Sequence, residues 1–139
     1  IFPTTVTFST DLHSLGQWIQ DGERSIIETM VSVEGTPEND VIIQGEELSK
    51  NGLDYLTGRS LHWVNRQAEE ATCIAHREGG VPLFRIKLPR LDEYNLGMLI
   101  LFFEMAAGVS GYMMQINPFD QPGVEAYKQK MNQLLEKPV

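Results

Sequence analysis

Lys128 is the residue whose position most clearly allows chemistry. The chain from Pro122 onward predicts a helix with one apolar stripe, formed by Val124, Met131, Leu134 and Leu135. Lys128 falls inside that stripe, four residues after Val124 and three before Met131. A lysine there extends its ammonium to solvent, pairs with Glu125, or binds a ligand. The nearby helix N-terminus could also hold an anion, so a structural and a functional interpretation both stay open.

The segment before this helix predicts a strand and a turn. Tyr112–Ile116 is a short apolar run that is typical of a buried strand. Asn117–Pro118 interrupts the run. Asp120 or Gln121 can cap the next helix, and Pro122 fits its first position, where a missing N–H costs nothing. Because loops at strand ends often carry the chemistry of α/β proteins, this segment is where we look for function first.

His13 is the second residue with chemical potential. The residues after Thr10 or Asp11 predict a helix that ends near Asp21–Gly22. Its expected inward positions are Leu12, Leu15 and Ile19. His13 falls in the first turn, where the helix dipole disfavours a protonated imidazole. A neutral imidazole can act as acid or base toward a hydroxyl group, but the position equally fits a surface histidine near a helix start.

Composition excludes several classes of protein. The chain has 139 residues, with 11 basic and 19 acidic side chains and a net charge of −8, which argues against a nucleic-acid or anionic-membrane partner. The single Cys73 cannot form an internal disulfide, no signal peptide is visible, and we expect a cytoplasmic location. The apolar run at residues 96–108 contains Glu104 and is expected to be a buried helix, too short for a membrane span. No cofactor and no metal are expected.

The rest of the chain predicts strands that alternate with helices. Strands are expected at residues 26–33, 72–76 and 83–88, a short strand or edge piece at 41–43, and helices at 53–70 and 91–107. Residues 46–51 read as a polar connection and 79–82 as a turn. This alternation favours an α/β fold with a parallel or mixed sheet flanked by helices.

Two segments carry a family resemblance. The stretch from Gly111 to Lys128 resembles the C-terminal signature of the phosphoglucose isomerase family, with Phe119–Gln121 and Gly123–Glu125 at the family's spacing. Residues 8–20, which include His13, are similar to a second landmark in the form found in Bacillus-type bacterial enzymes. The resemblance covers essentially the whole chain, including residues 79–82 and 91–94.

The resemblance implies a fold and an activity. We expect residues 1–139 to be the C-terminal part of a large three-layer domain of the sugar-isomerase (SIS) type, incomplete here and ending in the C-terminal helix. The implied enzyme is a homodimeric aldose–ketose isomerase that interconverts glucose 6-phosphate and fructose 6-phosphate through a cis-enediol. Family chains are several times longer, so the phosphate-binding Ser/Thr loop and the proton-transferring glutamate are expected upstream of Ile1. A fragment of this kind is expected to be inactive alone.

The resemblance also implies roles for individual residues. Lys128 and His13 are expected to open the sugar ring, with His13 reaching the active site of the neighbouring subunit. Gln121 is expected to hydrogen-bond the phosphosugar near its reacting end, since an amide both donates and accepts. Lys128 would also offset negative charge on oxygen. Asp120 is expected to be a cap or an orienting residue.

Three other polar residues are expected to have no catalytic role. Glu28 reads as an ordinary polar position at the edge of a strand or helix. His62 reads as a helix-surface residue, and His76 as a strand-end or loop residue.

Two alternatives remain. The first is a stand-alone phosphosugar-binding regulatory module of the SIS type, which would need its own Ser/Thr phosphate loop. Thr4–Thr5 and Ser9–Thr10 are the nearby possibilities, and neither is followed by a glycine-rich turn. The second is a structural or interaction domain without chemistry.

Overall fold

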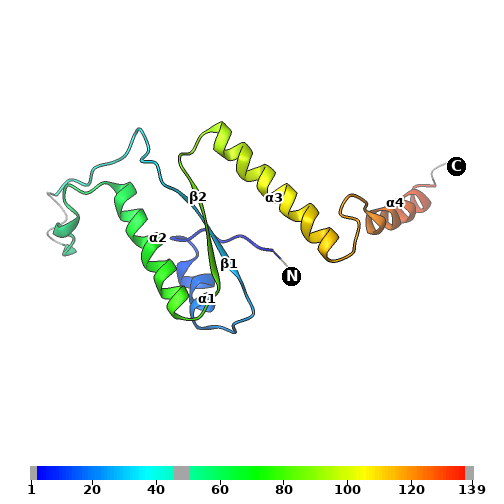
Figure 1. The fold of residues 1–139 in the computed structure, drawn as a ribbon, viewed down its shortest axis with the longest axis horizontal. Helices are drawn as coiled ribbons and strands as arrows, with labels where there is room; N and C mark the ends of the chain where they lie inside the picture. Colours follow the sequence, from blue (N-terminus) through cyan, green and yellow to red (C-terminus); the bar gives the residue numbers. More distant parts are fainter. Residues whose placement is uncertain (1–2, 46–50, 137–139) are drawn as a thin grey trace. The chain divides into compact units, whose positions relative to one another are not determined.

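The computed structural model describes residues 3–45 and 51–136. Its elements follow one another as a π-helix at Leu12–Gly16, α1 (Gln17–Asp21), β1 (Glu28–Val33), a 3-10 helix at Asp54–Leu56, α2 (Leu61–Glu78), β2 (Leu83–Leu88), α3 (Glu93–Met113) and α4 (Pro122–Leu134) (Figure 1). The chain divides into two compact units, Ile1–Leu91 and Asp92–Val139.

The first unit is built on two parallel strands. β1 pairs with β2 in a register that runs from Glu28 opposite Leu83 to Val33 opposite Leu88. Parallel strands need a long crossover connection, and α2 lies within it (Figure 1). The strands expected at residues 26–33 and 83–88 are therefore confirmed, as is the α/β class with a parallel sheet. The finer three-layer SIS architecture stays a prediction.

The helix α2 differs from its expected bounds at both ends. It begins after Ser60, whose Oγ accepts a hydrogen bond from the N–H of Trp63 at 3.0 Å. The preceding residues cannot join it, because Gly58 has a φ of 78°. The strand expected at residues 72–76 is wrong. This stretch continues α2, since Cys73 and His76 are buried three residues apart on one face of the helix.

Two side chains attach α1 to α2. Gln20 donates from Nε2 to the carbonyl of Ala75 at 3.2 Å. The Arg24 guanidinium donates to the carbonyls of Ile19 at 3.0 Å and Gly79 at 2.7 Å. Among the described residues of the unit, Ile19, Cys73, Val81 and Leu88 are the buried apolar ones. Ile19 is thus inward as expected, whereas the expectation for Leu15 is wrong, since 45% of it is exposed.

A short edge piece precedes α2. Ile42 forms an isolated antiparallel bridge with Ser60, as expected for residues 41–43. Asp40 accepts hydrogen bonds at Oδ1 from the N–H groups of Val41 at 2.9 Å and His62 at 3.1 Å. The polar connection expected at residues 46–51 lies outside the described residues except for its last position. The edge piece is therefore joined to the first turn of α2 by a carboxylate.

The second unit begins with α3, which is longer than expected. Asp92 caps it by accepting the N–H of Asn95 at 2.8 Å. The strand expected at residues 112–116 is wrong, because Tyr112 and Met113 form the last turn of α3 and a turn follows. A short apolar run fits a strand and the end of an apolar helix equally well, and here the helix continues through Gly108 and Gly111 into the run.

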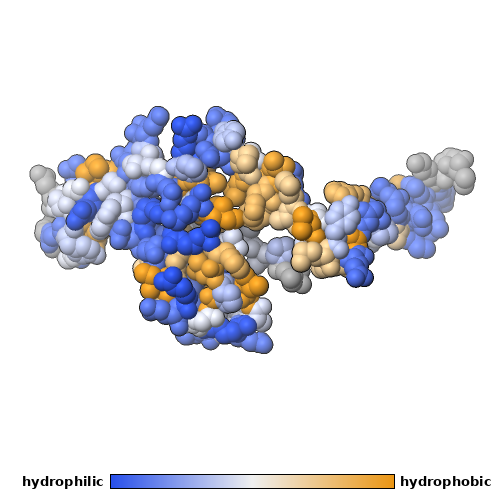
Figure 2. Space-filling view, in the orientation of Figure 1, coloured by the Kyte–Doolittle hydropathy of each residue, from blue (hydrophilic) through white to orange (hydrophobic). Residues whose placement is uncertain are grey.

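The helix α3 is apolar on all sides. Figure 2 shows hydrophobic residues over its exposed surface, and of its residues only Gly111 is buried within the described chain. With 21 residues it is the one described helix long and apolar enough to cross a membrane by length and composition, a test that core helices of soluble proteins also pass. The expectation that this run is too short for a span is therefore wrong, and the absence of a membrane partner stays a prediction.

Candidate functional site

The turn between α3 and α4 places Gln121 at a helix start. Gln121 is the N-cap residue of α4 and Pro122 is its first residue, as the sequence predicts. The Gln121 side chain makes no capping hydrogen bond. Its exposed amide therefore has both hydrogen-bonding functions to offer a ligand.

Helical spacing puts the backbone position of Lys128 on the same side of α4 as that of its N-cap residue, Gln121. Seven residues along an α-helix amount to nearly two full turns, so the two positions are about 10 Å apart along one stripe. The Nζ atom of Lys128 donates to Oε1 of Glu125 at 2.7 Å, which confirms the expected pairing. The two side chains are 56% and 61% exposed. Exposed pairs of this kind contribute little free energy, so an anionic or hydroxylated ligand can replace Glu125.

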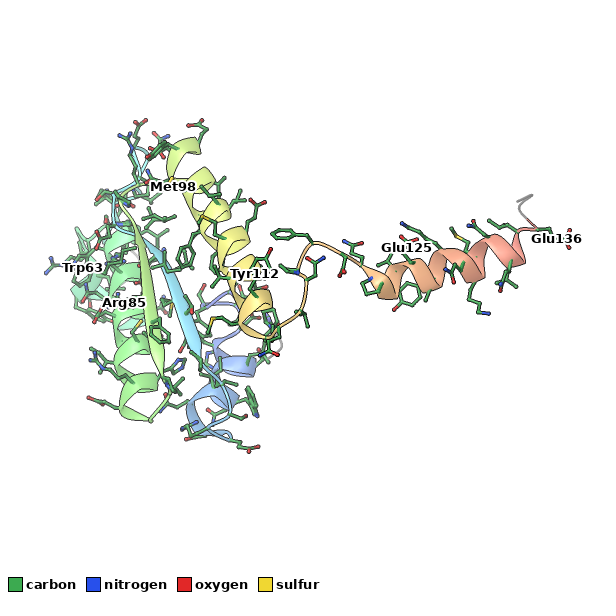
Figure 3. All side chains as sticks on the ribbon, turned by 45° about the vertical axis from the view of Figure 1, so that its right-hand side comes forward. Trp63, Arg85, Met98, Tyr112, Glu125 and Glu136 are labelled. Carbon is green, nitrogen blue, oxygen red and sulfur yellow. The ribbon has the colours of Figure 1, made fainter. Side chains whose placement is uncertain are left out.

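The turn itself is held against the end of α3. The N–H of Ile116 donates to the carbonyl of Gly111 at 3.1 Å, and the N–H of Phe119 donates to Oδ1 of Asn117 at 3.1 Å. The ring of Phe119 packs edge-on against Tyr112, with 6.1 Å between ring centroids. Figure 3 shows Tyr112 at the end of α3 and Glu125 near the start of α4. Gln121 thus follows a turn with a defined conformation.

His13 lies in the first unit, on the exposed side of the π-helix. The residue that precedes this helix is Asp11, one of the two expected caps. Asp11 Oδ2 accepts the N–H of Thr7 at 2.8 Å, and the N–H of Asp11 donates to the Thr7 carbonyl at 2.9 Å. Within this closed turn Ser9 has a φ of 84°, which is strained for a residue other than glycine.

Local features around His13 are typical of functional sites. Backbone strain and π-helical turns both occur there more often than elsewhere. His13 belongs to the first unit, whereas Gln121 and Lys128 belong to the second. A meeting of the three in one site therefore stays a prediction.

Glu28 and His76 form a buried pair that the sequence did not reveal. Oε2 of Glu28 lies 2.8 Å from Nδ1 of His76, and only 9% and 4% of these side chains is exposed. Glu28 is the first residue of β1, in line with its expected place at a strand edge, but its side chain is buried and not an ordinary polar position. The expectation of a loop or strand end for His76 is wrong, since it lies in α2. Phe8 covers the histidine edge-on at 5.6 Å. The pair joins β1 to α2 beside the segment that leads to His13.

The remaining charged contacts have structural roles. Arg85 on β2 donates to Glu69 at 2.9 Å and to Glu70 at 2.6 Å on α2, and the hydrogen bond to Glu70 lowers the pKa of that carboxyl group. Figure 3 shows Arg85 on its strand. His62 lies in the first turn of α2, in line with its expected place on a helix. Across residues 3–45 and 51–136, no three His, Cys, Asp or Glu side chains gather in a way that could hold a metal ion.

Comparison with known proteins identifies relatives along the whole chain. The sequence model of the phosphoglucose isomerase family matches residues 8–139. The chain is 54% identical to a glucose-6-phosphate isomerase from Clostridioides difficile over 138 residues, and 51% identical to those from Parabacteroides distasonis and Bacillus cereus. Each alignment covers 99% of this chain.

A solved structure shares the fold. A crystal structure of a hypothetical protein from Thermus thermophilus matches 92% of this chain with a TM-score of 0.81 and 29% sequence identity. The chain covers 30% of that protein and 30–31% of the three curated relatives. It thus spans about a third of the length of the proteins it resembles.

Proposed function

Because this chain belongs to the phosphoglucose isomerase family, we propose that it supplies the C-terminal part of an enzyme that interconverts glucose 6-phosphate and fructose 6-phosphate. The observation that carries the proposal is the placement of Gln121 and Lys128 on one face of α4, directly after a defined turn. In this position an amide and an ammonium can contact one sugar at two points. The larger architecture we propose is a three-layer domain of the sugar-isomerase type.

Ring opening is the step we assign to residues of this chain. In it the bond between C1 and the ring oxygen breaks, and the C1 hydroxyl becomes a carbonyl. One group removes the proton of the C1 hydroxyl, and another gives a proton to the ring oxygen. We assign this exchange to His13 and Lys128, with His13 arriving from the neighbouring subunit of a homodimer. The exposed pair of Lys128 with Glu125 suits this role, because substrate can replace the carboxylate.

Isomerisation itself needs groups outside these 139 residues. We propose that a carboxylate from the rest of the enzyme transfers a proton between C2 and C1 through a cis-enediol, and that a Ser/Thr loop there binds the phosphate. Gln121 binds the hydroxyl at the reacting end. Because its amide both accepts and donates hydrogen bonds, it can bind this oxygen as a hydroxyl and also as a carbonyl. The proposed enzyme acts in the cytoplasm and uses no cofactor.

The alternative is a phosphosugar-binding regulatory module. The same exposed Gln121 and Lys128 would serve binding without turnover. Ligand binding without isomerisation by the full-length protein would favour this alternative.

The decisive experiment is a coupled assay from fructose 6-phosphate to glucose 6-phosphate with the full-length protein. Lys128→Ala and His13→Ala should each lower kcat by about 10²-fold, the contribution expected of a proton-transfer group. The control is Lys130→Ala on the same helix, because Lys130 contacts Gln133 at 3.2 Å and lies off the stripe of Gln121 and Lys128. Near-normal turnover of a site variant removes that residue from the mechanism, and no turnover by the unaltered protein contradicts the proposed function.

A further inference from the structure

Gly111 lies where the turn before α4 comes very close to α3. A Cβ atom at this position would be 2.7 Å from Cβ of Pro118, and 3.1 and 3.3 Å from its Cγ and Cδ. Carbon atoms that are not bonded prefer about 3.5–4.0 Å, so such a contact cannot be accommodated without movement. The neighbour is a proline ring fixed to the backbone and cannot rotate away. Any residue larger than glycine must therefore push the turn outward.

The turn that would move leads directly to Gln121. Gly111 also accepts the N–H of Ile116 at 3.1 Å, so the same residue holds the start of the turn. Phe119 follows Pro118 and packs on Tyr112. Gln121 comes only three positions after Pro118, and the helix that carries Lys128 begins immediately afterwards.

We propose that Gly111 is a positioning residue for the isomerase site. Its missing side chain lets Pro118 rest on α3, and this contact sets where Gln121 and Lys128 are presented. The inference rests on the proposed function. Restoring an ordinary contact after adding a methyl group requires a displacement of about 1 Å, and a misplacement of this size can cost about 10²-fold in rate.

A merely structural role for Gly111 would have a different signature. Alanine is a better helix former than glycine, so Gly111→Ala gains intrinsic stability in α3 while it displaces the turn. If the residue served only packing, the substitution would change the thermal midpoint and leave the kinetics of the folded enzyme intact. A positioning role predicts the reverse, a fall in kcat with a nearly unchanged midpoint.

The test is a set of variants of the full-length enzyme in the coupled isomerase assay. Gly111→Ala should lower kcat by roughly 10- to 100-fold and change KM less than about threefold. Pro118→Gly added to Gly111→Ala removes the clashing Cβ and should restore most of the turnover. Pro118→Ala added instead keeps that Cβ and should restore little. Wild-type turnover of Gly111→Ala, or equal effects of the two second substitutions, would overturn the inference.

A second variant covers the case in which Gly111→Ala does not fold. Phe119→Leu adds no atoms and removes the ring contact with Tyr112 that holds the same turn. We expect it to lower kcat several-fold at a similar KM. Unchanged kcat would count against the inference.

Lys128→Ala and Gln121→Ala separate this inference from the proposed function. If both keep normal turnover, the proposed site is wrong. If both lose turnover while Gly111→Ala does not, the site stands and only the positioning role fails.

Discussion

Among the residues that the structure describes, Glu125 is the partner of Lys128 that competes with its proposed function. Glu125 holds the ammonium at 2.7 Å in a solvated pair, where the interaction is worth little. The ammonium is therefore held near the face of Gln121 at low energetic cost. A phosphosugar can take over this contact without leaving a buried charge behind. The sequence spacing alone predicts the pair, and the same geometry leaves the ammonium available.

Glu28 and His76 form a buried pair, in contrast to the exposed pair of Lys128 and Glu125. Both side chains are almost fully buried, and each provides the other's polar partner at 2.8 Å. A buried polar group that loses its partner keeps its desolvation cost, whereas a surface group recovers water. This pair therefore stabilises the fold, and its place beside Phe8 also supports the turn before His13.

Glu28→Ala should destabilise the full-length protein by about 2 kcal/mol, because it leaves a buried imidazole without a partner. Glu28→Gln keeps a hydrogen-bonding oxygen and should cost less than about 1 kcal/mol. Urea denaturation measures both. Glu23→Ala, at an exposed position of the connection that precedes β1, is the control and should be within about 0.5 kcal/mol of wild type. Equal stabilities of Glu28→Ala and Glu23→Ala would show that the pair contributes nothing.

At the scale of elements, Asp40 joins the edge piece at residues 41–43 to α2. The Ser60 hydroxyl and the N–H groups of His62 and Val41 lower the pKa of its carboxyl group below the ordinary value. An anion also suits this place, because it lies at the positive end of the helix dipole. The contact explains why a short edge segment is ordered next to a helix start.

The direction of the pKa shift of Asp40 determines how the stability from this contact changes with pH. A carboxyl group whose pKa is lowered in the folded state adds stability above its unfolded pKa, about 3.9, and loses it as pH falls through the folded value. Asp40→Asn should therefore lower the thermal midpoint at pH 7, and its difference from wild type should shrink below about pH 4. Thermal melts of the full-length protein across pH measure this, with Glu38→Gln on the same loop as control. A difference that is constant with pH would contradict the assignment.

At the scale of the whole molecule, the main feature is the exposed apolar surface of α3. This helix is apolar on all sides, yet Gly111 is the only one of its own residues that is buried within the described chain. The chain spans about 30% of its curated relatives. In the proposed enzyme, we expect residues outside these 139 to cover this helix.

The isolated 139-residue chain should show no isomerase activity and should self-associate through its exposed apolar surface. The full-length protein should be active and should not share that behaviour. The coupled assay and sedimentation of both forms measure these outcomes. Turnover by the isolated chain would mean that a carboxylate among its own residues transfers the proton, and Glu28 would have to be reconsidered.

The sequence by itself determined the features that depend on local chemistry. Local sequence predicts the proline at the start of α4, the i,i+3 pair of Lys128 with Glu125, and the strands at 26–33 and 83–88, because each depends on neighbours in the chain. Family membership followed from the signature at residues 111–128 and is confirmed. The roles of His13, Gln121 and Lys128 stay predictions.

Only the tertiary structure decided the features that depend on distant residues. Residues 72–76 favour a strand locally, but burial of Cys73 and His76 keeps them in α2. The Glu28–His76 pair joins positions 48 residues apart, which no local pattern encodes. The need for glycine at position 111 likewise appears only when Pro118 folds back on α3. The physical reason is that burial and close contact are properties of the packed chain, whereas propensity and spacing belong to each segment alone.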